Sequence, residues 1–223
     1  MEGRSYPLNS PLIGRHLAYP VLAALAVAHA EGIPMEQACW SLETLTPTPK
    51  RMEPMPLPNG ATLLCDHSTS TLETVEAALL TLKELPAGRR IVVLGDLTEA
   101  PGSTGPLYRR IGALLARTAD LVVLYGGHTR PYRTGATRAG MPRESIFEVG
   151  RSIQNAVDLL RQELRAGDAV LLKARGHQRF DRIAMALSGR DVRCDLAVCR
   201  AIPTECGTCA MADRGWDGLR AVF

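Results

Sequence analysis

The sequence predicts an α/β protein whose main part is a doubly wound, mainly parallel β-sheet preceded by a helical segment. Three observations support this prediction. From residue 61 onward, short apolar runs rich in valine, isoleucine and leucine alternate with amphipathic stretches, a pattern typical of parallel strands covered by helices on both faces. Before residue 47, apolar residues recur at helical spacing. Five prolines between Pro47 and Pro58 separate the two parts and interrupt regular structure.

The helical part is predicted to form a hairpin. The apolar run 17–30 indicates a buried helix that Gly32 ends, with Leu22 and Leu25 on its inner face, and Pro34 begins a second helix. The first run is shorter than the roughly 20 residues that a bilayer requires. We therefore expect no membrane-spanning helix.

The proline-rich stretch 47–60 is expected to be a linker between the helical remnant 1–46 and the sheet domain 61–190. The residues 191–223 form a tail that contains cysteines. The predicted strands are 61–66, 90–96, 120–127, 145–149, 168–174 and 192–198. The predicted helices are 71–85, 108–119, 129–140, 152–164 and 180–188.

Composition excludes several classes of protein. A formal charge of +3 with dispersed basic residues argues against a nucleic-acid partner. The N-terminus has no basic stretch leading into an apolar core, so a cytoplasmic location is expected. None of the three lysines follows a glycine, and no G-x-G-x-x-G occurs. The chain therefore has neither a G-x-x-x-x-G-K-[ST] phosphate loop nor a dinucleotide fingerprint.

Four segments together resemble one family: 14–53, 59–82, 88–100 and 167–187 are similar in order and spacing to the latter half of a Mur ligase. The likeness is greatest to the UDP-N-acetylmuramoyl-tripeptide–D-alanyl-D-alanine ligase type. The resemblance implies an enzyme that phosphorylates a carboxylate with ATP and Mg²⁺ and lets an amine attack the acyl phosphate. It covers only the end of the central ATPase domain and the Rossmann-like C-terminal domain.

The resemblance assigns nucleotide-binding roles to three residues. His16 matches part of a family G-x-H-N-x-x-N helix near the adenine, although Leu17 and Pro20 replace its asparagines. Arg51 matches an arginine that reaches the ATP phosphates, a task that suits a guanidinium because it stays charged and can bind two oxygens. Asp66 matches an aspartate near the ribose. The alternatives are a helix cap for His16 and an exposed linker arginine for Arg51.

The resemblance also assigns an amine-substrate site. The family has a K-x-S-R segment that binds the incoming amino acid or peptide, and here Lys173 matches its lysine. Arg175 replaces the serine and Gly176 the arginine. Lys173 and Arg175 are therefore either an anion site for the substrate carboxylate or part of a solvated turn.

Other strand-end loops have open interpretations. Ser70 or Thr71 is expected to cap the next helix. Asp96 and Glu99, in a segment similar to a family G-D-M-x-E, are expected either to meet a ligand or to cap a helix. The loop Gly126-Gly127-His128 is expected to be either a ligand-facing turn or a plain tight turn, and the plain turn is favoured.

The tail holds a cluster of four cysteines: Cys194, Cys199, Cys206 and Cys209. The last two have the C-x-x-C spacing that lets two thiolates bind one metal ion. The cluster is a candidate zinc or iron–sulfur site, a redox pair, or a set of ordinary thiols.

The resemblance thus implies the ATP-closing and amine-binding portion of a Mur-type amide ligase, which is expected to be inactive by itself without a phosphate loop. It either works with a separately encoded N-terminal half or is derived from such an enzyme. Its expected ligands are a nucleotide and an amino acid or dipeptide. The alternative is a non-catalytic Rossmann-like binding module of the same descent. In a third interpretation, the tail is a metal-stabilised contact for a partner protein.

Overall fold

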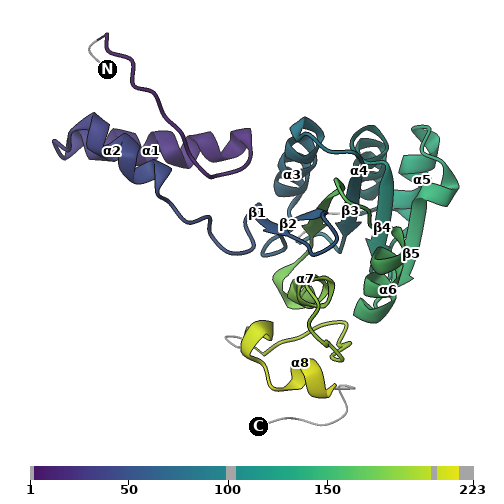
Figure 1. Cartoon of the computed structure of the whole chain (residues 1–223). Coiled ribbons are helices and arrows are strands. Elements are labelled where there is room, and N and C mark those ends of the chain that lie inside the picture. Colours follow the sequence, from purple (N-terminus) through teal and green to yellow (C-terminus); the bar gives the residue numbers. More distant parts are fainter. Residues whose placement is uncertain (1–2, 99–103, 202–204, 216–223) are drawn as a thin grey trace.

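The computed structural model describes residues 3–98, 104–201 and 205–215, which contain a six-stranded sheet flanked by helices (Figure 1). The strands are β1 (Glu53–Pro56), β2 (Thr62–Asp66), β3 (Arg90–Leu94), β4 (Leu121–Tyr125), β5 (Ile146–Gly150) and β6 (Ala169–Lys173). The α-helices are α1 (Ala18–Ala30), α2 (Met35–Glu43), α3 (Leu72–Glu84), α4 (Thr104–Thr118), α5 (Arg130–Arg138), α6 (Ile153–Glu163), α7 (Asp181–Leu187) and α8 (Met211–Arg214). Short 3-10 turns are η1 (Arg15–Leu17), η2 (Arg143–Ser145), η3 (Gly176–Gln178) and η4 (Cys206–Thr208).

The strand order is β1-β2-β6-β3-β4-β5. All neighbours are parallel except β1, which pairs antiparallel with β2. This arrangement confirms the predicted doubly wound α/β fold. It also places the carboxyl ends of β2, β6 and β3 side by side, with Asp66 opposite Lys173 and Lys173 opposite Leu94.

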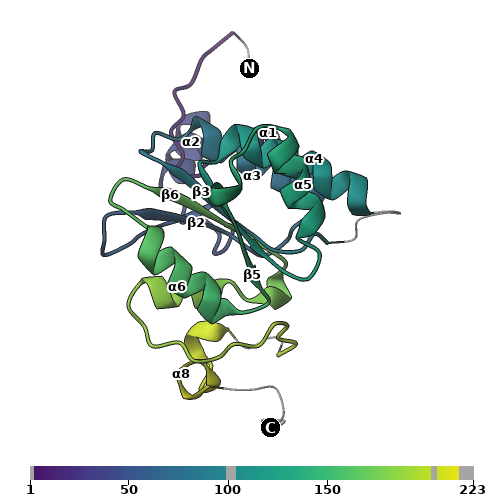
Figure 2. The ribbon, with the colours of Figure 1, turned by 90° about the vertical axis from the view of Figure 1, so that its right-hand side faces the viewer.

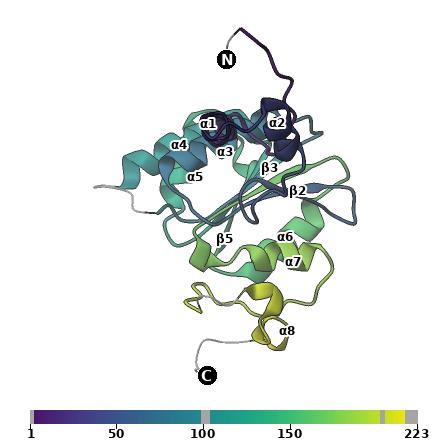
Figure 3. The ribbon, with the colours of Figure 1, turned by 90° about the vertical axis from the view of Figure 1, so that its left-hand side faces the viewer.

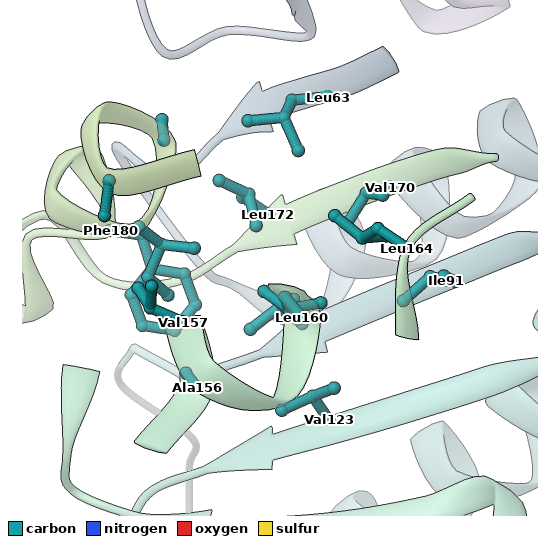
Figure 4. Packing of buried hydrophobic residues seen from close by; sticks show 14 of the residues in the cluster. Leu63, Ile91, Val123, Ala156, Val157, Leu160, Leu164, Val170, Leu172 and Phe180 are labelled. Carbon is teal, nitrogen blue, oxygen red and sulfur yellow. The ribbon is translucent and has the colours of Figure 1, made fainter. Parts of the chain in front are cut away.

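Helices cover both faces of the sheet (Figure 2), and each face has its own apolar core. Successive residues of β2 contribute to the two cores in turn. Leu63 and Cys65 belong to the core under α6 and α7, and Leu64 belongs to the core under α3, α4 and α5. This is the two-residue period of a strand. Figure 4 shows the first core, where Phe180 and Leu172 lie close to α6. Because both faces are covered, β2, β3, β4 and β6 are mostly apolar and buried, and their apolar runs could be recognised in the sequence.

Thr71 caps α3, as predicted for that loop. Its hydroxyl accepts a hydrogen bond from the backbone N–H of Thr74 at 3.4 Å. This bond satisfies one of the free N–H groups of the first helical turn.

The segment 47–60, expected to be a linker, contains strand β1. Pro54 and Pro56 lie within it, opposite Leu64 and Thr62 of β2. Proline cannot donate to a strand ladder, but an edge strand pairs on one side only and tolerates it. The proline-rich stretch therefore forms the antiparallel edge of the sheet.

The predicted strand at 192–198 is wrong, because side chains bind the backbone groups that a strand ladder would use. Arg182 donates to the carbonyl oxygens of Cys194 (3.1 Å) and Leu196 (2.6 Å). The N–H groups of Arg193 and Cys194 both donate to the carbonyl of Ala212. The segment is thus held by α7 and α8 in an irregular conformation.

The predicted helix at 17–30 is present as α1, but the prediction that it is buried is wrong. In α1, Val21 and Leu25 are buried, whereas Leu22, predicted to face inward, is 60% exposed. The α1–α2 hairpin stands beside α3, outside the body of the sheet (Figure 3). No helix in the described part of the chain is long and apolar enough to cross a membrane.

Candidate functional site

A buried ion pair joins the carboxyl ends of β2 and β6. The Nζ atom of Lys173 lies 2.6 Å from Oδ2 of Asp66, and both residues are buried. Burial lowers the pKa of Lys173, and the charge and hydrogen bond of Asp66 offset only part of that effect. Removing one partner of such a pair leaves an uncompensated buried charge.

This ion pair changes the interpretation of Lys173. Its side chain is 1% exposed and its ammonium donates to Asp66. Arg175 is half-buried, and its backbone N–H donates to Oε1 of Gln178 at 3.2 Å. The structure thus does not present Lys173 and Arg175 as two open cations of one anion site.

The three residues expected to bind a nucleotide line one cavity. His16, Arg51 and Asp66 come from η1, from the segment before β1 and from the end of β2, and they border a space of about 500 Å³. Its remaining lining residues are Leu17, Thr48, Glu73, Thr74 and Ala77. The cavity therefore combines the Arg51 cation, the carboxylates of Asp66 and Glu73, and apolar surface, a mixture of groups that can meet the different parts of a phosphorylated nucleoside.

Arg51 is presented to this cavity by a constrained backbone. The residues on either side of it, Lys50 and Met52, have φ angles of 62° and 48°. For non-glycine residues this left-handed conformation costs about 1–2 kcal/mol each. The guanidinium of Arg51 donates to the hydroxyl of Thr69 at 2.8 Å. The surrounding contacts must hold this conformation in place.

The carboxyl ends of β3 and β4 form a tightly packed polar corner. Oε1 of Gln178 accepts from the N–H of Asp96 at 3.0 Å, and Nε2 of Gln178 donates to Oδ2 of Asp96 at 3.2 Å. A Cβ atom at Gly95 would collide with Gln178, and one at Gly126, whose φ is 140°, with Asp96. Glycine is thus required at both positions, so the Gly126 turn also makes room for Asp96.

Basic residues border this corner. Burial lowers the pKa of His177, and the charge of Arg175 lowers it further, while Asp96 acts in the opposite direction. The guanidinium of Arg151 lies against Gly127. The corner thus places the Asp96 carboxylate near several basic side chains. Glu99, the other acidic candidate of this loop, lies outside the described residues.

The four tail cysteines line one cavity of about 260 Å³, and none forms a disulfide. Within residues 3–98, 104–201 and 205–215, however, no three histidine, cysteine, aspartate or glutamate side chains gather closely enough to hold a metal ion. Burial raises the pKa of Cys206 to about 11, so its thiol stays protonated, and Cys194 Sγ accepts from Arg182 at 3.4 Å. The expected zinc or iron–sulfur site at Cys194, Cys199, Cys206 and Cys209 has no support in this structure.

Sequence reasoning missed a polar cluster next to the cavity that His16, Arg51 and Asp66 line. Lys50 forms ion pairs with Asp181 (2.8 Å) and Glu205. His67 is 2% exposed, and its Nδ1 atom lies 3.8 Å from Oδ2 of Asp181 and has no hydrogen-bond partner among the described residues. The position of His67, directly after Asp66 at a strand end, was the one signal in the sequence.

Comparison with known proteins decides the family. Residues 50–176, more than half of the chain, match the family described as "Mur ligase, glutamate ligase domain". The chain belongs to the Mur ligase family. It is 30% identical over 179 residues to a UDP-N-acetylmuramoyl-L-alanyl-D-glutamate–2,6-diaminopimelate ligase of Thermosynechococcus vestitus, covering 78% of this chain and 35% of that protein. It is 25% identical to a UDP-N-acetylmuramoyl-tripeptide–D-alanyl-D-alanine ligase of Bacillus subtilis, covering 79% of this chain and 39% of that protein.

Solved Mur ligases share the fold. The MurF ligase of Thermotoga maritima in complex with ADP superposes with a TM-score of 0.66 at 18% identity, over 79% of this chain and 39% of that chain. A MurF of Acinetobacter baumannii gives a TM-score of 0.70 at 18% identity, over 82% and 40%. The chain thus spans between a third and a half of the length of these relatives, and the Mur ligase resemblance read from the sequence is confirmed.

Proposed function

We propose that this chain is the C-terminal portion of a Mur-type, ATP-dependent amide ligase of peptidoglycan precursor synthesis, acting in the cytoplasm. Its role is to close over ATP and to present the amine substrate. The observation that carries the proposal is the convergence of His16, Arg51 and Asp66 on one cavity. These residues come from three separate segments, and each has chemistry suited to a different part of a nucleotide.

The roles follow from the side chains. Arg51 binds phosphate oxygens, since its guanidinium is exposed at the cavity and keeps its charge at all relevant pH values. Asp66 accepts hydrogen bonds from the ribose, and Lys173 holds the Asp66 carboxylate in place. His16 borders the base. ATP, when bound with Mg²⁺, supplies the phosphoryl group that activates a carboxylate. We propose that the Mg²⁺ ligands lie in the rest of the ligase, together with the phosphate loop.

The amine substrate is proposed to bind at the corner formed by Asp96 and Gln178, beside Arg175. Asp96 suits an ammonium group and Arg175 a carboxylate. An amino acid or dipeptide carries both. The backbone carbonyl of Lys173 accepts from the N–H of Gly95 at the base of this corner. Its ammonium is paired with Asp66, so we propose that Lys173 does not contact the substrate.

The chemistry requires a phosphate loop, which these 223 residues do not contain. We propose that the remainder of the ligase, as a separate subunit or as more of the same chain, covers the exposed apolar face of the α1–α2 hairpin. Tyr19, Val27 and Trp40 on this face are each more than 60% exposed. The absence of a phosphate loop also favours the second candidate function, a nucleotide-binding module without ligase activity.

The test is a calorimetric titration of the purified chain with Mg-ATP and then with D-alanyl-D-alanine or diaminopimelate. Arg51→Ala should weaken ATP binding roughly tenfold, because one charge-assisted contact is lost. Arg138→Ala, at an exposed position at the end of α5, is the matched control and should bind like wild type. A folded chain that binds neither ATP nor ADP would contradict both candidate functions.

Amine binding separates the two candidates. A ligase portion should bind one of the amine substrates. Asp96→Asn should weaken the binding of that amine and leave the binding of ATP unchanged. A chain that binds ATP but neither amine would favour the non-catalytic module.

A further inference from the structure

The loop that carries Arg51 (residues 48–53, called the Arg51 loop below) is held by several contacts. The N–H of Arg51 donates to the carbonyl of Thr48 at 3.1 Å, and the N–H of Lys50 donates to the Glu53 carboxylate at 2.9 Å. Met52 is 2% exposed and packs in the core beneath α3. These contacts lie within the loop or join Met52 to the core, and none of them reaches α7 or the tail.

The side chain of Lys50 supplies the missing restraint. Its ammonium donates to Oδ1 of Asp181, the first residue of α7, at 2.8 Å, and also to the carboxylate of Glu205 in the tail. Lys50 and Glu205 are separated by 155 positions in the sequence. One lysine thus ties together the Arg51 loop, the start of α7 and the tail.

This cluster is more than an exposed surface contact. The side chains of Lys50 and Asp181 are 21% and 13% exposed, and the buried His67 lies beneath Asp181. Burial lowers the pKa of Lys50, but the hydrogen bonds and charges of Asp181 and Glu205 outweigh it and leave that pKa raised. The ammonium therefore stays charged at neutral pH.

We propose that Lys50 is a positioning residue whose ion pairs with Asp181 and Glu205 hold the Arg51 loop in its left-handed conformation and so direct the Arg51 guanidinium toward the nucleotide phosphates. The inference rests on the proposed nucleotide-binding function. It gives the tail, which lies beyond the residues that match the family, a role at the nucleotide site.

The variant Lys50→Gly helps to distinguish the effect of the Lys50 side chain from the effect of its backbone conformation. Glycine adopts a φ of about +60° without strain, so Lys50→Gly keeps the conformation accessible while it removes the ion pairs. Because glycine also adds backbone freedom, Lys50→Met, which removes the charge and keeps a side chain, is measured beside it. A loop that depends on the ion pairs loses its order in both variants, whereas a loop that depends only on the backbone stays ordered in Lys50→Met.

The first experiment is hydrogen–deuterium exchange of peptides that cover 44–57 in the whole chain. Glu205→Gln should speed exchange in these peptides about threefold or more, because it releases the loop from the tail. The matched control is Asp213→Asn, which removes a different ion pair of the tail, 3.6 Å from Arg190, and should leave 44–57 unchanged. Equal exchange in Glu205→Gln and wild type, with both proteins folded, would overturn the proposal.

The second experiment compares the binding of ADP and adenosine. Lys50→Gly should weaken the binding of ADP about threefold or more. It should leave the binding of adenosine unchanged, because only the phosphates contact Arg51. It should have no further effect in the Arg51→Ala background, and Lys50→Arg should restore binding by keeping the charge. ADP binding that Lys50→Gly leaves intact would overturn the positioning role alone. No ADP binding by the folded wild-type chain would overturn the proposed function and with it the phosphate role.

Discussion

The sheet domain and the α1–α2 hairpin are both rich in apolar residues but bury them to very different degrees. Leu79 in α3 and Val123 in β4 are fully buried, whereas the best-buried residues of the hairpin, Val21 and Cys39, keep 6% exposure. Val27, on the same helix as Val21, is 63% exposed. Apolar composition alone does not bury a helix; a facing surface is needed. The sheet offers α3 such a surface, and the hairpin has only its own two helices.

The same contrast holds for charges. The Asp66–Lys173 pair inside the sheet domain is almost completely buried. The pair between Arg15, in η1 before the hairpin, and Glu84 of α3 has an N–O distance of 3.1 Å and side chains that are 87% and 48% exposed. Water screens the second pair and not the first. Stability should therefore depend on the two pairs very unequally.

The largest effect is expected from breaking the buried pair. Asp66→Asn should lower the free energy of unfolding by about 3–5 kcal/mol, because it leaves the Lys173 ammonium buried without a countercharge. Glu84→Gln, which breaks the exposed pair, should cost less than about 1 kcal/mol. Urea denaturation followed by circular dichroism measures both.

A double variant checks the cause. Lys173→Met in the Asp66→Asn background removes the uncompensated charge and should recover much of the loss. If the double variant is no more stable than Asp66→Asn alone, the loss comes from packing and the electrostatic explanation is wrong.

The second effect concerns packing. Leu79→Ala, in the core beneath α3, should cost about 3 kcal/mol because the surrounding sheet cannot collapse into the cavity. Leu25→Ala, at 9% exposure in the hairpin, should cost about half as much or less, because a two-helix core relaxes more easily. Thermal or urea unfolding of the two variants compares them directly. Equal losses would mean that the hairpin is packed as firmly as the sheet.

These contrasts explain how much the sequence could predict. Strands β2, β3, β4 and β6 are buried on both faces, so their apolar runs marked them. The conformation of 192–198 could not be read, because it depends on the Arg182 guanidinium binding the carbonyls of Cys194 and Leu196. A pattern of apolar residues does not show where an arginine will donate.

The candidate site, too, could be predicted from the sequence only in part. The family resemblance, and not the spacing, suggested His16, Arg51 and Asp66, which the fold brings to one cavity. Lys50 and Glu205 are 155 positions apart in the sequence, and no local sequence pattern predicts their contact. Long-range ion pairs of this kind appear only once the tail is placed.

The third prediction concerns the pH dependence of the free energy of unfolding. Burial lowers the pKa of His67 below its usual value of 6.5, so the unfolded chain binds a proton that the folded chain resists. Stability should therefore be full above about pH 6.5 and fall as the pH drops below it, by at most about 1.4 kcal/mol per pH unit. His67→Gln should flatten this slope between pH 6.5 and 5. The exposed His29 of the hairpin provides the control, because His29→Gln should leave the slope unchanged.

The smallest effect is expected on the open face of the hairpin, where Val27→Ser should change the free energy of unfolding by less than about 0.5 kcal/mol. The side chain meets solvent, so little burial is lost. Leu25→Ser, two positions away and buried, should cost at least about 2 kcal/mol. Urea unfolding at two protein concentrations a hundredfold apart gives the comparison. A loss above 1 kcal/mol for Val27→Ser that grows with concentration would mean that a second copy covers this face. A small, concentration-independent change leaves the face open for the rest of a ligase, as the proposed function requires.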